Sequence, residues 1–256
     1  MKYAVEISNF FYENLFEDLT MNIEINKFIT LSSPNNCGKT TLIRILNREI
    51  ITKSDIKVLG YPINDYSIDE YSSLVQCVIP NEKITTLKSV EEELKSTNAS
   101  SDMIEWIFSG LKMKKIRNKR IDNLNQEDFI KYQLSVAIAK TPRILLIDSI
   151  SPYFSDIEMK EIIRFLKEVH LKYPITIIYT TLDLEESILT DYLYIINDKK
   201  IALEGFPIQV LQKDNIINKI GLNIPFMVDL SVKLRDYNLI EDIELDKNRL
   251  VDLLWK

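Results

Sequence analysis

One short segment constrains the fold of this chain more than any other. The segment SSPNNCGKTT, residues 32–41, follows an apolar stretch typical of a strand and precedes leucines and isoleucines at helical spacing. A loop between a strand and a helix presents backbone N–H groups at a helix N-terminus, where they can bind phosphate. Its end matches the pattern G-x-x-x-x-G-K-[ST], with Ser33 in place of the first glycine. An ordinary strand-to-helix turn is the alternative, but the flanking elements favour a phosphate-binding loop (P-loop).

The types of residue in this loop assign roles to them. Lys39 can reach the β- and γ-phosphates of a nucleotide, and the hydroxyl of Thr40 can bind Mg²⁺. Ser33 and Asn36 stand where glycine is usual, and asparagine tolerates a positive φ better than serine does. The predicted nucleotide-binding residues of the loop are Ser33, Asn35, Asn36, Cys37, Gly38, Lys39, Thr40 and Thr41.

Composition limits the class of protein. The formal net charge is −6 and the pI is about 5.1, which argues against a nucleic-acid binder. No apolar run reaches the ~18 residues of a membrane span, and the first residues lack the apolar stretch of a signal peptide. The two cysteines suit a reducing compartment. We therefore expect a cytoplasmic protein.

Hydrophobic patterning predicts the other elements. Buried strands alternating with helices indicate a parallel α/β sheet, and the early strands suggest an antiparallel side sheet. We expect the strand that ends at Asp148 to lie beside the P-loop strand. The expected strands are 3–7, 21–25, 28–32, 56–59, 74–79, 144–147 and 175–180, with a hairpin of 192–196 and 200–204; the expected helical segments are 90–119 and 157–171.

Residues outside the P-loop resemble the ATP-binding-cassette (ABC) ATPases, and specifically the ATPase subunits of energy-coupling-factor (ECF) transporters. Segments 8–19, 89–94, 134–148, 183–187 and 195–207 carry the likeness, and 220–231 resembles the tail of ECF ATPases. The absence of an N-K-x-D motif argues against a small GTPase. The resemblance implies an α/β ABC-type nucleotide-binding domain of the P-loop NTPase class. It would span 1–205, with an antiparallel β side sheet, a helical subdomain at about 82–142 and a C-terminal helical extension, 206–256.

The resemblance also implies the ligands ATP and Mg²⁺ and the roles of three further groups. Asp148 closes an apolar strand, so it matches the aspartate that binds Mg²⁺ together with Thr40. Lys39 and Asp148 are the implied catalytic residues. Tyr12 matches the aromatic residue that stacks on adenine, and a core position in its strand is an equal alternative.

Several family positions hold other residues. The family's general base, a glutamate, is replaced by Ser149, and its switch histidine by Leu182. The glutamine of the Q-loop falls on Pro80 or Gln76, and the aspartate of the D-loop falls on Ser155, next to Asp156. The signature L-S-G-G-Q is replaced by Leu-Asn-Gln-Glu-Asp at 124–128, whose acidic pair would repel a phosphate. The sole histidine, His170, precedes the expected strand and is expected at the surface.

These replacements predict that the chain binds Mg-ATP but hydrolyses it poorly, since a general base contributes about 10²–10⁴ in rate. The resemblance implies a second ABC ATPase subunit as partner, in a homodimer or heterodimer, and a transmembrane coupling subunit. The chain would then be peripheral on the inner face of the cell membrane. The alternative is a nucleotide sensor or scaffold on the same fold with no role in transport.

Overall fold

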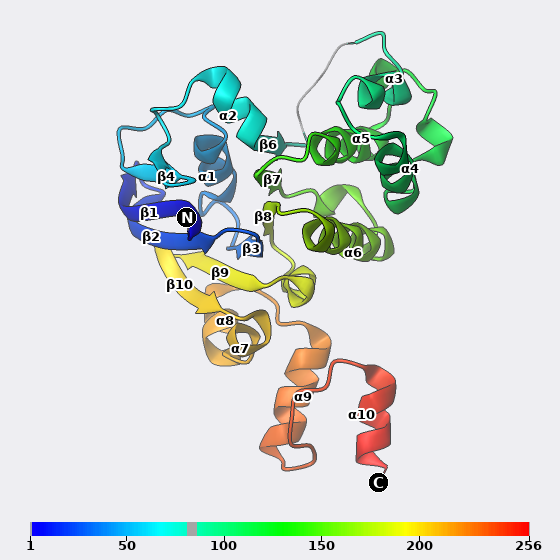
Figure 1. The fold of residues 1–256 in the computed structure, drawn as a ribbon. Helices are drawn as coiled ribbons and strands as arrows, with labels where there is room; N and C mark the ends of the chain where they lie inside the picture. Colours follow the sequence, from blue (N-terminus) through cyan, green and yellow to red (C-terminus); the bar gives the residue numbers. More distant parts are fainter. Residues whose placement is uncertain (1, 81–85, 256) are drawn as a thin grey trace.

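The structure, a computed structural model that describes residues 2–80 and 86–255, contains two β-sheets, of which the larger runs through the middle of the molecule and the smaller lies at one edge (Figure 1). The larger sheet has the strand order β10-β9-β3-β8-β7-β6, and the smaller has the order β2-β1-β4-β5. The strands are β1 (Tyr3–Tyr12), β2 (Phe16–Glu24), β3 (Phe28–Ser32), β4 (Ile56–Val58), β5 (Tyr61–Pro62), β6 (Val75–Val78), β7 (Ile144–Asp148), β8 (Thr176–Thr181), β9 (Tyr192–Asn197) and β10 (Lys200–Gly205).

The larger sheet is parallel except for β10, which forms the predicted hairpin with β9. Every residue of β3, β7 and β8 is buried, as helices on both faces of a parallel sheet require. The expected neighbour of the P-loop strand was wrong. Strand β8 lies between β3 and β7 and pairs with both, so Asp148 is one strand further away. An apolar pattern predicts that a strand is buried but carries no information about strand order.

The smaller sheet is antiparallel, as predicted, and its first two strands are longer than their patterns indicated. Strand β1 has two register shifts between Ile7 and Tyr12, and these irregularities break the alternation of apolar and polar residues. Strand β2 alternates regularly only from Leu19 onward, and Phe16, Leu19 and Met21 are buried in the same cluster as the helix that follows the P-loop.

The helix expected at 157–171 is confirmed and spans 156–172, whereas the segment expected to be helical at 90–119 is divided. The segment 90–119 forms two helices and a 3₁₀ turn, because the first helix ends at Lys95 and Ser100 caps the next. The boundary expected near residue 82 for the helical subdomain lies outside the described residues. The helices before the C-terminal part are α1 (Lys39–Leu46), α2 (Ile68–Leu74), α3 (Val90–Lys95), α4 (Ser101–Gly110), η1 (Lys114–Ile116), η2 (Ile121–Asn123), α5 (Gln126–Ala139), η3 (Ser151–Tyr153), α6 (Asp156–Lys172) and η4 (Leu184–Leu189).

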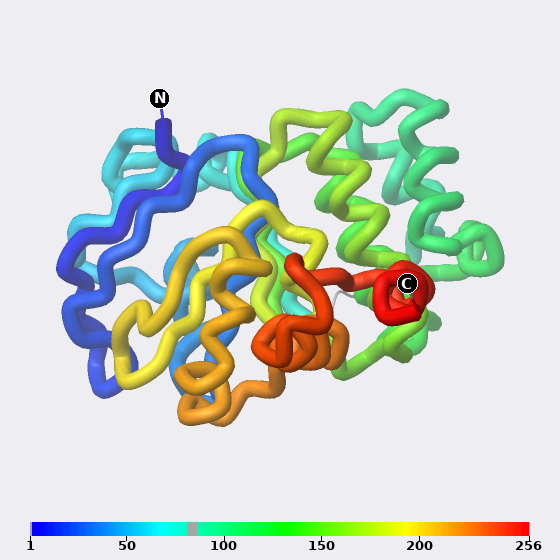
Figure 2. Tube along the Cα trace, turned by 90° about the horizontal axis from the view of Figure 1, so that it is seen from below, coloured from blue at the N-terminus to red at the C-terminus, as the bar shows by residue number. Residues whose placement is uncertain are grey.

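The C-terminal part is helical, as predicted. One buried cluster joins β9 and β10 to the first three of these helices through residues such as Leu203, Leu211 and Val228. The last two helices lie side by side at one end of the molecule (Figures 1 and 2). The helices are α7 (Pro207–Leu211), α8 (Asp214–Ile220), α9 (Phe226–Asp236) and α10 (Lys247–Leu254).

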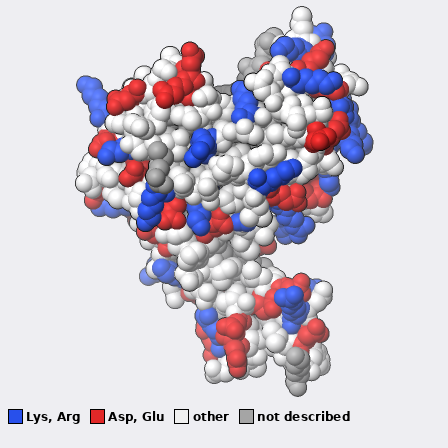
Figure 3. Space-filling view, in the orientation of Figure 1, with Lys and Arg blue, Asp and Glu red and all other residues white. Residues whose placement is uncertain are grey.

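Charged side chains of both signs are mixed over the face shown in Figure 3, where lysines and arginines lie beside aspartates and glutamates. The basic segment around η1 follows this pattern, since Lys112 pairs with Glu161 and Arg117 with Glu91. Within residues 2–80 and 86–255, no helix combines the length and apolar character needed to cross a membrane.

Candidate functional site

The loop after β3 has the backbone shape that its sequence predicts. Asn36 has φ +63° and Gly38 has φ +89°, whereas the φ of Ser33 is not positive. Serine at the first glycine position is therefore unstrained, and asparagine occupies the position where a left-handed backbone is needed. A Cβ on Gly38 would lie 2.6 Å from Cζ of Phe16, so the loop packs tightly against β2 at this point.

Lys39 begins helix α1 and extends back along the loop. Its Nζ donates to the carbonyl oxygen of Ser33 at 2.8 Å, to Oγ of Ser33 at 2.9 Å and to the carbonyl oxygen of Pro34 at 3.2 Å. Burial lowers the pKa of Lys39, and the charges of Cys37 and Asp148 oppose that shift. The ammonium group is thus almost fully desolvated, with loop oxygens around it and the carboxylate of Asp148 in electrostatic range.

A cavity of about 470 Å³ opens over this loop. It brings together all of the predicted loop residues except Ser33, which is fully buried behind the loop. Tyr12 is not in the lining and stacks on Phe10, with ring centroids 6.1 Å apart. The lining residues are Leu15, Asn35, Asn36, Cys37, Gly38, Lys39, Thr40, Thr41, Ser149, Pro152 and Leu182.

Leu15 is a lining residue that the sequence did not single out. It lies in the turn between β1 and β2, and no local pattern distinguishes it from other exposed or half-buried leucines. Only the packing of the antiparallel sheet on the P-loop brings this turn to the cavity.

The end of β7 fixes the carboxylate of Asp148. Its Oδ1 accepts a hydrogen bond from Oγ1 of Thr180 at 2.8 Å, and the side chain is buried. Among residues 2–80 and 86–255, no cluster of three or more His, Cys, Asp or Glu residues could hold a metal ion. Mg²⁺ on a nucleotide needs fewer protein ligands, because phosphate oxygens and water complete its octahedron. The hydroxyl of Thr40 and the carboxylate of Asp148 have the chemistry of that donor set, but only Thr40 lines the cavity.

Two of the replaced family positions face the cavity. Ser149 has φ +42°, and its backbone N–H and Oγ both bond to Oγ1 of Thr180, at 3.0 and 3.1 Å. Leu182 presents a side chain with no proton to donate or accept. None of the described residues that line the cavity is an aspartate or a glutamate.

The two candidates for the Q-loop position, Gln76 and Pro80, make hydrogen bonds away from the P-loop cavity. The side-chain amide of Gln76 donates to Ser72 and Val75 carbonyls, and its oxygen accepts from Lys140 at 3.0 Å, beside a different cavity. The carbonyl oxygen of Pro80 accepts from the amide of Gln126. Neither residue lines the P-loop cavity.

Ser155, at the D-loop position, is the N-cap of helix α6. Its hydroxyl accepts from the backbone N–H of Glu158, and the Glu158 carboxylate accepts from the backbone N–H of Ser155, which makes a capping box. Asp156 lies in the first turn of α6. The local structure of this segment is therefore explained by helix capping.

The segment at the signature position forms the start of α5. Asn125 caps this helix, because its Oδ1 accepts from the backbone N–H of Asp128 at 2.7 Å. The two acidic residues are paired: Glu127 with Lys131 at 2.5 Å, and Asp128 with Lys119 at 3.5 Å. The sequence alone does not reveal these two cations as neighbours, and the repulsion of a phosphate expected from the acidic pair stays a prediction.

The prediction that His170 lies at the surface was wrong. Its side chain is 8% exposed, and Nε2 lies 3.0 Å from Oδ2 of Asp191. Nδ1 lies 3.1 Å from the carbonyl oxygen of Ile175, the residue before β8. The histidine therefore fixes the turn between α6 and β8 to the start of β9, at the opposite end of the sheet from the P-loop.

Known proteins resemble the chain over most of its length. A family model described as ABC transporter matches residues 16–151. The energy-coupling factor transporter ATP-binding protein EcfA1 of Bacillus subtilis is 24% identical over 250 residues, which cover 93% of this chain and 89% of that protein.

Two solved structures share the fold. The cbiO1 protein of Clostridium perfringens, part of the ABC transporter complex cbiONQ, has a TM-score of 0.71 at 19% identity, covering 90% of this chain and 99% of its own. A dimeric ATP-binding cassette bound to ADP and Pi has a TM-score of 0.65 at 18% identity, covering 79% of this chain and 98% of its own.

Proposed function

The chain belongs to the ABC transporter family, and on that premise we propose that it is the ATP-binding subunit of an ECF-type membrane transporter. The observation that carries the proposal is the cavity over the P-loop, where the Lys39 ammonium, the Thr40 hydroxyl and the backbone at the start of α1 meet. The 93% coverage of this chain by an energy-coupling factor relative supports the ECF type.

Each predicted site residue would hold a different part of Mg-ATP. The Lys39 ammonium and the loop N–H groups would hold the β- and γ-phosphates. Thr40, in the cavity lining, would hold Mg²⁺ together with Asp148, a buried residue outside that lining. The metal supplies charge stabilisation at the phosphate oxygens when it is bound. Tyr12, at the end of β1, is proposed as the adenine-stacking residue.

We propose further that hydrolysis is slow. Ser149 and Leu182 stand at the cavity wall where a base and a switch histidine are needed, and no described carboxylate lines the cavity. Loss of a positioned base alone reduces the rate by about 10²–10⁴. That factor corresponds to about 3–5.5 kcal/mol of activation free energy.

Isothermal titration calorimetry with Mg-ATP tests the binding step. We expect binding by the unmodified chain and loss of at least about 100-fold in affinity for Lys39→Met, because a charge-assisted contact to phosphate disappears. Lys53→Met is the matched control, since Lys53 is an exposed lysine away from the cavity. Equal affinity for both variants and the unmodified chain would contradict the proposal.

The partners are proposed from the family and from the relatives. A second ATP-binding subunit would pair with this chain, as supported by the dimeric cassette, and a transmembrane coupling subunit would bind it at the inner face of the membrane. Residues 1–205 would form the nucleotide-binding domain and 206–256 an extension that contributes to assembly. Affinity purification of the tagged chain from native membranes should recover both partners. Recovery of the chain alone would favour a nucleotide sensor outside transport.

A further inference from the structure

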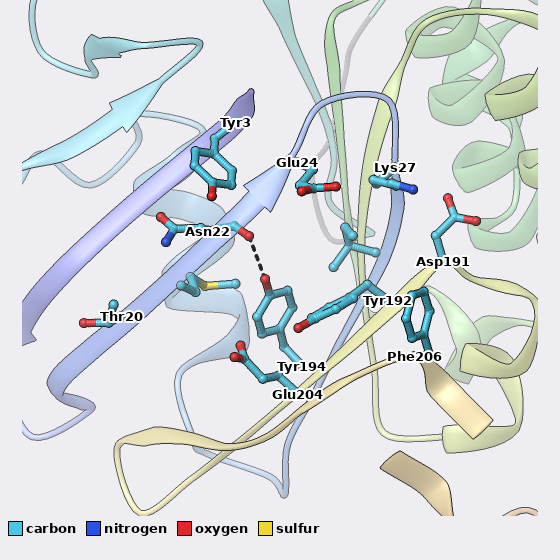
Figure 4. A pocket seen from close by; sticks show the side chains of 12 residues that line it. Tyr3, Thr20, Asn22, Glu24, Lys27, Asp191, Tyr192, Tyr194, Glu204 and Phe206 are labelled. Atoms are coloured by element: carbon cyan, nitrogen blue, oxygen red, sulfur yellow. Dashed lines mark hydrogen bonds between the residues drawn. The ribbon is translucent and has the colours of Figure 1, made fainter. Parts of the chain in front are cut away.

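A second cavity, of about 420 Å³, lies at the end of β3 opposite the P-loop (Figure 4). Lys27 and Ile29, at the start of β3, lie in its wall, whereas the P-loop follows the last residue of the same strand. Strand β2 forms one side, and strands β9 and β10 form the other. The cavity is therefore separate from the proposed nucleotide site.

Aromatic rings form a rigid wall of this cavity. The rings of Tyr192 and Tyr194 have centroids 4.8 Å apart, and the ring of Phe206 lies 6.3 Å from that of Tyr192. The hydroxyl of Tyr194 donates to the carbonyl oxygen of Asn22 at 2.7 Å and so ties β9 to β2 (Figure 4). This hydrogen bond holds the ring of Tyr194, against which the ring of Tyr192 packs, in place before a ligand arrives.

Carboxylates line the same space. Glu24 and Glu204 flank the tyrosines in Figure 4, and burial followed by the charges of Glu204 and Glu24 raises the pKa of Tyr192. Within the part of the chain that the structure describes, the exposed carboxylate of Glu204 makes neither an ion pair nor a hydrogen bond, and the exposed carboxylate of Glu24 pairs only with Lys2, at 3.7 Å. The third carboxylate, Asp191, is already bonded to Lys167, His170 and the backbone N–H of Phe28.

We propose that this cavity binds a small organic cation that carries an alkylammonium group, with Glu204 and Glu24 as counterions and the rings of Tyr192 and Phe206 as its apolar and cation–π surface. Two independent features point to such a ligand: the unpaired carboxylate of Glu204 and aromatic faces, which attract ammonium groups. The volume suits one small molecule. Among the described residues that line the cavity, Lys27 is the one cation, and it lies at the Asp191 end (Figure 4). An anionic ligand such as a nucleotide is disfavoured by this balance.

A titration followed by ¹H–¹⁵N NMR tests the inference on the full chain. The probe is n-butylammonium chloride; n-butanol controls for the apolar chain and sodium chloride for ionic strength. We expect the alkylammonium ion to shift the amide resonances of residues 192–194 and 204–206, and neither control to do so. The resonances of the P-loop, residues 33–41, should stay in place.

Single substitutions test the contributions of the carboxylate charge and of the aromatic ring to binding separately. Glu204→Gln should weaken binding by about fivefold, as expected for loss of one exposed ion pair, and Phe206→Leu by about threefold. Glu241→Gln, an exposed glutamate outside the cavity, should have no effect. Unchanged urea midpoints in all three variants would exclude a purely structural role.

Equal shifts from n-butanol, or unchanged affinity in Glu204→Gln, would overturn the proposal. Tighter binding of a capped lysine peptide than of n-butylammonium would also overturn it, by assigning the cavity to a protein partner.

Discussion

The close packing of Gly38 against Phe16 predicts how much a larger residue at position 38 destabilises the protein. Gly38 has φ +89°, and a Cβ there would lie 2.6 and 3.0 Å from two ring carbons of Phe16. Phe16 is fully buried at the start of β2, so its ring has little room to move. Substitution Gly38→Ala therefore combines a strained backbone with an overpacked core.

The backbone strain and the overpacking each lower the free energy of unfolding by an amount that can be given a range. An alanine in the left-handed region costs about 1–2 kcal/mol. Overpacking of a buried ring typically adds about 1–3 kcal/mol. Gly38→Ala should therefore lower the free energy of unfolding by about 2–5 kcal/mol, the sum of these ranges.

A double-mutant cycle isolates the packing part. Phe16→Leu removes the ring carbons that the new methyl group would meet and alone should cost about 1–2 kcal/mol as a cavity-forming substitution. The double variant should be more stable than the sum of the single effects by about 1–3 kcal/mol, measured by urea unfolding. Additive effects within about 0.5 kcal/mol would refute the close approach of the P-loop to β2.

Two other predictions concern single contacts. Asn125→Ala should lower the free energy of unfolding by about 1 kcal/mol, because it removes the cap of α5, and Asn125→Ser should restore most of it; urea unfolding that gives no difference between the two variants would contradict the cap. Burial opposes ionisation of Asp191, but hydrogen bonds from Lys167 and the backbone of Phe28 outweigh it and lower the pKa of Asp191. The ionised carboxylate thus contributes stability above its unfolded pKa of about 3.9, and this is lost as the pH falls through the lower folded pKa. Asp191→Asn should therefore destabilise the chain by about 2 kcal/mol at pH 7, and the difference should narrow as the pH falls below about 3.9; a difference that stays constant as the pH falls below that value in urea unfolding would contradict this.

Local chemistry in the sequence predicted the P-loop well. The succession of strand, loop and helix is confirmed, and the left-handed backbone of Asn36 matches what that residue tolerates. The positions of Ser149 and Leu182 at the cavity could be predicted because each directly follows a buried strand of one parallel sheet. Parallel strands bring their carboxyl ends to one edge, so this part needs no knowledge of strand order.

Contacts between distant segments could not be predicted in the same way. The burial of His170 depends on Asp191, which lies beyond strand β8, and the pairing of Asp128 depends on Lys119, which reaches it across the turn before α5. The position of β8 between β3 and β7 likewise depends on how the strands pack in the tertiary structure. Sequence patterns give the periodicity of each element, whereas these features arise only when the elements pack.

The decisive measurement is single-turnover chemistry on bound nucleotide. Purified chain in excess over γ-labelled Mg-ATP is sampled by rapid quench, and bound ATP and released phosphate are separated over time. We expect the nucleotide to bind and to remain ATP, with release of phosphate at least about 100-fold slower than for an ABC ATPase that has its base glutamate. Release at the rate of such an intact enzyme would contradict this expectation.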